Sequence, residues 1–176
     1  IFLRNTAIIK YPSIMIEVKN IQKSFGDKKV LQDVSFLMEA GNTNLIIGTS
    51  GSGKTVLMKC MIGLFQPDAG QILYEGRDMI QIDEKEKKEI RQQIGMLFQG
   101  SALFDSKTVQ DNVMFPLDMF TKQRYREKLK RVREVLDRVN LKDADRKFPA
   151  EISGGMKKRV ALARALVLNP KYLFCD

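Results

Sequence analysis

Residues 48–55 constrain the fold of this chain more than any other stretch. They fit the pattern Gly-x4-Gly-Lys-Thr, and a helical pattern follows them. We expect a strand over residues 43–47, then a loop whose glycines let successive backbone N–H groups face one anion, then a helix whose N-terminus adds donors. Lys54 suits the β- and γ-phosphates and the Thr55 hydroxyl suits Mg²⁺. The stretch predicts a purine nucleoside triphosphate site; a glycine-rich turn before an ordinary helix is the alternative.

Length and composition indicate one globular domain. A chain of 176 residues buries about 70% of its unfolded surface. The contents of 44% hydrophobic and 29% charged residues are ordinary for a globular protein, and no apolar run approaches the ~18–20 residues that cross a bilayer. Residues 1–14 lack a small-residue cleavage site, so we expect an extension or arm there and a domain that begins at Met15.

Charge and residue content limit which ligands and catalytic groups this chain can have. The net charge of +9 is compatible with nucleic acid, with an anionic membrane surface or with a solvated basic face, and we favour the solvated face. The sequence contains no histidine, which excludes histidine ligands and histidine general bases from these residues. Cys60 and Cys175 both lie in apolar runs, which predicts buried free thiols.

Hydrophobic periodicity predicts a mainly antiparallel sheet, followed by an α/β core and a group of helices. Strands are expected over residues 16–20, 30–39, 71–74, 94–98 and 171–176, and helices over residues 83–93, 108–115, 124–139 and 156–168. Pro116 should stop the second of these helices, and Ser153 should cap the last one. The apolar face of the amphipathic third helix should contain Tyr125, Leu129, Val132, Leu136 and Val139.

Two further segments carry polar residues where ligands commonly bind. Asp176 ends an apolar strand, and its carboxylate is expected to bind Mg²⁺ at the carboxyl end of the sheet. Residues 152–156 read Ile-Ser-Gly-Gly-Met and open a helix, which makes a second anion-binding helix N-terminus. One nucleotide needs one phosphate loop, so the second terminus should serve a nucleotide held by another copy. An N-cap followed by a flexible turn is the alternative.

In this order, the motifs resemble those of the ATP-binding proteins of ABC transporters. The likeness covers nearly all of residues 16–176. It joins the phosphate loop at 48–55, the Q-loop at Gln99, the signature at 152–156 and the Walker B strand at 172–176.

Two finer stretches resemble the ATPase of Mla-type phospholipid transporters. One is residues 97–106, Leu-Phe-Gln-Gly-Ser-Ala-Leu-Phe-Asp-Ser, with Thr108-Val109 and Asn112-Val113. The other is the signature, where Met156 stands at a position that is Gln in most ABC signatures.

The resemblance implies an α/β fold of the P-loop NTPase type, with a RecA-like parallel core, an antiparallel β subdomain and a helical signature subdomain. It assigns about 15–44 and 70–82 to the β subdomain, about 45–66, 90–99 and 165–176 to the core, and about 100–164 to the helical subdomain. Within 15–176 the site residues follow by position. ATP-binding residues would be Phe25, Gly48, Thr49, Ser50, Gly51, Ser52, Gly53, Lys54, Thr55 and Val56. Signature residues reaching the ATP of the opposing subunit would be Ser153, Gly154, Gly155 and Met156. Mg²⁺ ligands would be Thr55, Gln99 and Asp176.

Two of these roles carry further expectations. Phe25 matches the aromatic residue that stacks on adenine, although a core or turn aromatic is the alternative. The family places its catalytic Glu directly after the Walker B Asp, which lies past Asp176, and its switch histidine later still. We therefore expect a C-terminally truncated cassette with no catalytic residue of its own, which binds ATP and Mg²⁺ without turnover and leaves a sheet edge unpaired.

The resemblance also implies a location in the cell, a set of partners and a function. The protein is expected to be cytoplasmic and peripheral on the inner face of the cell membrane, as a homodimer bound to transmembrane permease subunits. The surface from Gln99 through Phe115 would receive a coupling helix, and a lipid-binding MCE-type protein or a solute-binding protein would be a further partner. No nucleic acid is expected. The expected function is ATP-powered phospholipid trafficking between membranes; the alternatives are an ABC ATPase for an amino acid, metal or drug, and a non-transport ABC protein acting on ribosomes or DNA.

Overall fold

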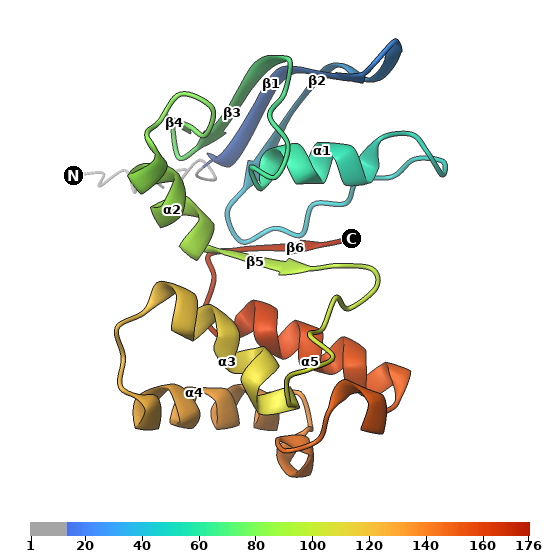
Figure 1. The fold of residues 1–176 in the computed structure, drawn as a ribbon. Coiled ribbons are helices and arrows are strands. Elements are labelled where there is room, and N and C mark those ends of the chain that lie inside the picture. The colour runs from blue at the N-terminus through green and yellow to red at the C-terminus, as the bar shows by residue number, and fades with distance from the viewer. Residues whose placement is uncertain (1–13) are drawn as a thin grey trace, which may run out of the picture. The chain divides into compact units, whose positions relative to one another are not determined.

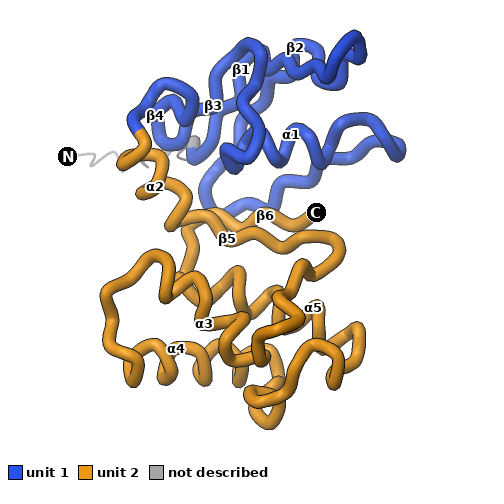
Figure 2. The backbone as a smooth tube through the Cα atoms, in the orientation of Figure 1, with its two compact units in different colours: residues 1–83 blue, residues 84–176 orange. Residues whose placement is uncertain are grey.

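The structure is a computed structural model that describes residues 14–176 (Figure 1). The chain divides into two compact units, residues 1–83 and residues 84–176 (Figure 2). The arm expected over residues 1–14 lies outside the described residues except for Ile14, which begins the first strand.

Unit 1 is built on an antiparallel sheet with the strand order β2-β1-β3-β4. Its strands are β1 (Ile14–Phe25), β2 (Lys28–Glu39), β3 (Ala69–Tyr74) and β4 (Arg77–Asp78). Three of the four strands expected in this region, over residues 16–20, 30–39 and 71–74, are confirmed, and β1 is longer than predicted. Because β1 pairs with β2 on one side and with β3 on the other, both ends of the intervening segment are fixed by the same sheet.

One helix, α1 (Lys54–Met61), lies in the segment between β2 and β3 and contacts β2. Its buried residues are Leu57, Met58, Cys60 and Met61. The fully buried Tyr74 of β3 donates its hydroxyl to the Met61 carbonyl oxygen at 2.8 Å. This bond joins the end of the helix to the sheet without leaving a buried hydroxyl unsatisfied.

The prediction of a strand over residues 43–47 is wrong. These residues belong to no helix or strand, and the side chains of Leu45 and Ile47 are 79% and 84% exposed. A strand needs a neighbour for its N–H and C=O groups, and among residues 14–176 no strand pairs with this segment. The apolar run therefore enters the phosphate loop as chain without strand pairing.

Unit 2 contains a parallel pair of strands and four helices. Its elements are α2 (Glu84–Gln92), β5 (Ile94–Leu97), α3 (Val109–Phe120), α4 (Tyr125–Arg138), α5 (Gly154–Leu166) and β6 (Tyr172–Cys175), with short 3-10 turns at Lys142–Ala144 and Pro149–Glu151. The strands β5 and β6 pair in parallel, with Leu97 opposite Cys175. Helix α5 packs closely on β5, because a Cβ added at Gly95 would lie 2.5 Å from the Ala165 carbonyl oxygen.

Helices α3, α4 and α5 share one apolar core, and Figure 1 shows them grouped on one side of the β5–β6 pair. The fully buried Val113, Val132 and Val160 represent the three helices in this core. The amphipathic prediction for α4 holds for Val132 and Leu136 but not for Tyr125, whose side chain is 60% exposed at the first helical residue.

Pro116 does not stop its helix, contrary to prediction. Helix α3 continues four residues beyond it to Phe120. A proline inside a helix removes one backbone hydrogen bond. Here Met114 and Leu117, which flank it, are 3% and 2% exposed in the shared core. Burial of these side chains outweighs the local penalty.

The prediction of two buried thiols is half right. Cys60 is buried in unit 1, whereas Cys175 is exposed. Burial alternates along β6, so Leu173 and Cys175 share its exposed face while Tyr172 and Phe174 are covered. No helix within residues 14–176 has the length and apolar character to span a bilayer.

Candidate functional site

The phosphate loop, residues 48–53, is irregular chain that ends at α1. Gly51 and Gly53 have φ angles of 78° and 95°, in a region that side chains disfavour. Gly53 is also the N-cap of α1, and a Cβ there would meet the Leu31 side chain at 3.0 Å. Both the backbone conformation and the close approach to β2 therefore require glycine at this position.

Lys54, the first residue of α1, closes this loop. Its Nζ donates to the carbonyl oxygens of Gly48 at 2.7 Å and Thr49 at 2.8 Å. The backbone N–H of Ser52 donates to the Thr49 carbonyl oxygen at 3.2 Å. The described first turn of α1 contains no acidic residue, so ammonium, helix N-terminus and loop combine into an electropositive cradle.

This arrangement fits a nucleoside triphosphate. Charged phosphate oxygens accept stronger hydrogen bonds than neutral carbonyls do, so the Lys54 ammonium can exchange its two carbonyl partners for a ligand. A Cβ at Gly48 would meet the Ser52 hydroxyl at 2.6 Å, so a side chain there would displace that hydroxyl. The Thr55 hydroxyl supplies a hard oxygen of the kind Mg²⁺ prefers.

Phe25 lies at the end of β1 with 46% of its surface exposed, which excludes a core role. Its ring packs edge-to-face on Phe65, with centroids 5.6 Å apart, and the Lys23 ammonium lies 5.5 Å from its centroid. Lys23 and the Ser24 N–H both donate to Asp68 at 2.6 Å, and these bonds hold the pKa of the Asp68 carboxyl below its ordinary value, the Lys23 bond contributing most. Stacking of Phe25 on adenine stays a prediction.

Gln99 and Asp176 lie at one end of the parallel strand pair. Gln99 follows β5 by two residues and is exposed, and Asp176 directly follows β6. The Asp176 backbone N–H donates to the Leu97 carbonyl oxygen at 2.9 Å, which extends the pairing to the strand ends. Unit 2 thus brings together two of the three expected Mg²⁺ ligands. Thr55 belongs to unit 1, so the complete site stays a prediction.

The signature segment forms the predicted cap of α5. Ser153 has an extended backbone, and its hydroxyl accepts a hydrogen bond from the Met156 N–H at 3.3 Å. Gly154 and Gly155 are exposed, and no described atom would lie within 4 Å of a Cβ at either one. Helix α5 carries no acidic residue in its described first turn. Its N-terminus is therefore open and electropositive, as a terminus that receives an anion from outside should be.

Sequence reasoning missed the contacts that hold the segment between β5 and α3. Arg164 of α5 donates to the carbonyl oxygens of Ser101 and Ala102, both at 2.8 Å. Asn112 of α3, which is fully buried, bonds the backbone of Phe104 and of residues 107–108. The sequence signals for Asn112 are its polar side chain inside an apolar helical pattern and its place in the stretch that resembles Mla-type ATPases. Nothing local marks Arg164, whose partners are more than sixty residues away in the chain.

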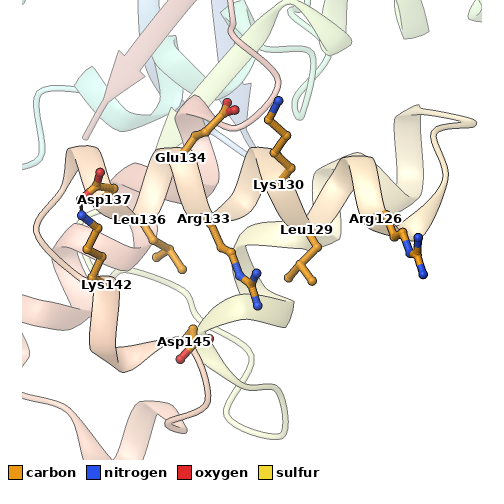
Figure 3. Close-up of a pocket in the computed structure, with 9 residues that line it drawn as sticks. All are labelled: Arg126, Leu129, Lys130, Arg133, Glu134, Leu136, Asp137, Lys142 and Asp145. Carbon is orange, nitrogen blue, oxygen red and sulfur yellow. Dashed lines mark ion pairs between the residues drawn. The ribbon is translucent and has the colours of Figure 1, made fainter.

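A groove of about 560 Å³ runs along α4 (Figure 3). Leu129 and Leu136 contribute apolar surface, and arginines, lysines and acids surround them. The only ion pair drawn between residues that line it is Lys142 with Asp137, at 3.0 Å. The groove contains none of the expected nucleotide residues.

Comparison with known proteins supplies the family context. A family profile described as ABC transporter matches residues 31–176. The probable ribonucleotide transport ATP-binding protein mkl of Mycobacterium leprae is 47% identical over 163 residues, which are 93% of this chain and 47% of that protein. The methionine import ATP-binding protein MetN of Clostridium acetobutylicum is 43% identical over 162 residues, 92% of this chain and 50% of that protein. The chain thus spans about half the length of the curated relatives it matches.

Solved structures show the same fold. The dimeric structure of a bacterial ABC transporter cassette superposes with a TM-score of 0.84 at 31% identity, covering 92% of this chain and 73% of that one. CbiO1 of Clostridium perfringens, described as part of an ABC transporter complex, gives a TM-score of 0.80 at 29% identity, covering 93% of this chain and 65% of that one. The expected α/β fold of the P-loop NTPase type, with an antiparallel β subdomain and a helical signature subdomain, is confirmed.

Proposed function

Because the chain belongs to the ABC transporter family of ATP-binding proteins, we propose that it is the nucleotide-binding part of a subunit that powers a transporter by binding and hydrolysing ATP. The observation that carries this proposal is the loop closed by Lys54, whose ammonium bridges two carbonyl oxygens at 2.7 and 2.8 Å at the start of a helix without an acidic first turn. Such a cradle binds phosphates through fixed donors and fixed charge.

The residues divide the work between two copies. Lys54 and the N–H groups of the phosphate loop would bind the β- and γ-phosphates of ATP, and Mg²⁺, held by the Thr55, Gln99 and Asp176 oxygens, would neutralise phosphate charge. Phe25 would stack on adenine. The open N-terminus of α5 at Ser153 would contact the γ-phosphate bound by the opposing subunit, so ATP would join a homodimer.

Closure of that dimer would exclude water from the phosphates, and binding energy would drive the conformational change. Permease subunits would convert closing and opening into substrate movement. This requires a position on the inner face of the cell membrane, where both the permease and ATP are found. The subdomain boundaries expected from the resemblance stay a prediction.

We propose phospholipid as the cargo, moved between membranes with the help of a lipid-binding MCE-type protein. Residues 97–106 and the signature Met156 support it, since both resemble Mla-type ATPases. Import of a small polar solute with a solute-binding protein is the second candidate. The names of the relatives favour it, because they refer to ribonucleotide and methionine transport.

Purification of the complete parent protein from its own membranes separates these candidates. Mass spectrometry of the co-purifying proteins and lipids should find a permease and bound phospholipid, and transport into vesicles should stop in Lys54→Ala. A permease with a solute-binding protein and no lipid would favour the second candidate. Ribosomes or DNA in place of a membrane partner would contradict both.

A further inference from the structure

The segment from Gly100 to Ser106 is backbone held in an unfavourable conformation. Ser101 and Ala102 have φ angles of 63° and 47°, so two successive residues with side chains occupy the left-handed region. Such conformations persist only where the surrounding structure enforces them, and they concentrate at functional positions. The two residues follow Gln99 by two and three positions. Contacts that hold their backbone conformation therefore also hold the chain that follows Gln99.

Arg164 enforces it. Its Nη1 donates to the Ala102 carbonyl oxygen and its Nη2 to the Ser101 carbonyl oxygen, both at 2.8 Å. The guanidinium carbon also lies 5.9 Å from the centroid of the Phe104 ring, which packs on Phe115 at 4.8 Å. A planar fork with two parallel donors fits two adjacent carbonyls, which a lysine ammonium on a flexible stem does not reproduce.

The positive charge of Arg164 strengthens its hydrogen bonds to the two carbonyl oxygens. No ion pair joins Arg164 to a carboxylate among the described residues, and burial lowers the pKa of its guanidinium. The bonds to the two carbonyls offset the cost of removing the cation from water. Asn112 holds the far end of the same segment, through four hydrogen bonds to residues 104–108.

Arg164 lies on α5, whose N-cap is Ser153. The two residues are eleven positions apart, about 16 Å along a helix axis. Figure 1 shows the segment after β5 running past α5 toward α3. A single helix therefore carries the signature glycines at its N-terminus and, further along, Arg164, which bonds the segment after Gln99.

We propose that Arg164 is a positioning residue that fastens the segment after Gln99 to α5, so that Gln99 and the N-terminus of α5 keep a fixed geometry relative to each other. Its catalytic consequence rests on the proposed function, in which Gln99 binds Mg²⁺ and Ser153 faces a γ-phosphate. Its structural content does not, because it concerns contacts within unit 2.

The test uses the complete parent protein with Arg164→Lys and the matched control Arg131→Lys. Arg131 is also a guanidinium in this bundle that donates to two carbonyl oxygens, those of Val167 at 2.9 Å and Leu166 at 3.3 Å, but it does not contact the segment after Gln99. Hydrogen exchange of residues 99–106 should accelerate at least about tenfold in Arg164→Lys and stay within about twofold in Arg131→Lys.

Steady-state ATP hydrolysis gives a second measurement. In Arg164→Lys the kcat should fall about tenfold to a hundredfold while the KM for ATP changes less than about twofold, because the phosphate loop is intact and only the geometry at Gln99 is loosened. In Arg131→Lys both constants should stay near those of the unaltered protein.

Unchanged exchange in Arg164→Lys overturns the proposal, and so does an equal effect in both variants. If Arg164→Lys does not fold, the unaltered protein decides: amides of Ser101 and Ala102 protected as strongly as those of α5 support the fastening, and amides that exchange as fast as those of residues 43–47 overturn it. An unaltered protein without ATP hydrolysis would contradict the proposed function alone, because the exchange data still decide the fastening.

Discussion

Two loops in this molecule are each closed by one cation that donates to two consecutive backbone carbonyls. In unit 1 the Lys54 ammonium bonds Gly48 and Thr49, and in unit 2 the Arg164 guanidinium bonds Ser101 and Ala102. The distances are nearly equal, at 2.7 and 2.8 Å in the first loop and 2.8 Å twice in the second.

The two contacts differ in how far apart their partners lie in the chain and in which residues adopt left-handed conformations. Lys54 is five and six residues from its partners, and glycines supply the left-handed conformations of its loop. Arg164 is 62 and 63 residues from its partners, and residues with side chains adopt the left-handed conformations there. We infer that the lysine contact is one that a ligand replaces, and that the arginine contact is one that the fold retains. Breaking the first kind should cost ligand affinity, and breaking the second kind should cost structure.

The largest expected effect is that of Asn112→Ala. This change leaves the Phe104 N–H without its acceptor and the carbonyls of residues 104, 107 and 108 without their shared donor. Urea denaturation should show a loss of about 2–4 kcal/mol in the free energy of unfolding. Gln110→Ala, on the same helix, is the control and should change it by less than about 0.5 kcal/mol. A loss in Asn112→Ala as small as in the control would show that the segment is not retained by the fold.

Lys54→Ala tests the other kind of contact. Loss of a charged donor to phosphate costs about 1.5–3 kcal/mol, so the affinity for ATP should fall roughly tenfold to 150-fold in calorimetry. The free energy of unfolding without nucleotide should change little, because only exposed carbonyls lose a partner. Lys85→Ala, an exposed lysine in α2, controls for net charge. Unaltered ATP affinity in Lys54→Ala, or an equal loss in Lys85→Ala, would break the distinction.

Exchange of glycine and alanine sharpens the comparison of the two backbones. Gly53→Ala should destabilise the protein by about 1–2 kcal/mol or more, since alanine is disfavoured at its φ of 95° and would press on Leu31. Ala102→Gly should instead stabilise it by up to about 1 kcal/mol, because relief of the left-handed conformation exceeds the added freedom of the unfolded chain. Thermal unfolding of both variants measures this, and shifts of the same sign would contradict it.

The smallest expected effect concerns Asp68, which ties the end of β1 to the chain leaving α1 through Lys23. The pKa of Asp68 is lower in the folded protein than its ordinary value of 3.8. Its stabilising contribution is therefore present above that value and disappears as the pH falls through the folded pKa. Asp68→Asn should lower the Tm slightly at pH 7, and the Tm values of the two proteins should converge at acid pH, once the Asp68 carboxyl is protonated in the folded protein. A Tm difference that persists at low pH would assign the effect to packing.

Local patterns predicted most of the fold. The helical period gave α4, a serine before two glycines gave the start of α5, and the glycine-lysine-threonine run gave the start of α1. Each of these depends on residues within a few positions of one another, so a sequence window contains the whole cause.

The failures share the opposite property. Residues 43–47 have the composition of a strand, but a strand depends on a neighbour that no window contains. The persistence of α3 through Pro116 depends on a core built from three helices. Arg164 and its carbonyl partners are joined only by the folded chain. The local structure expected at the candidate site, the loop before α1 and the cap of α5, could therefore be predicted from the sequence, whereas the long-range contacts that hold these segments in place could not.

The position of β1 between β2 and β3 determines where the backbone can be cut without dividing the sheet. Its neighbours β2 and β3 lie on either side of the excursion that contains the phosphate loop, and all three remain hydrogen-bonded through β1. A single backbone cut among the exposed residues 42–47 would leave both fragments in one sheet. Residues 42–47 are thus a suitable place to open the chain for a two-fragment complementation assay.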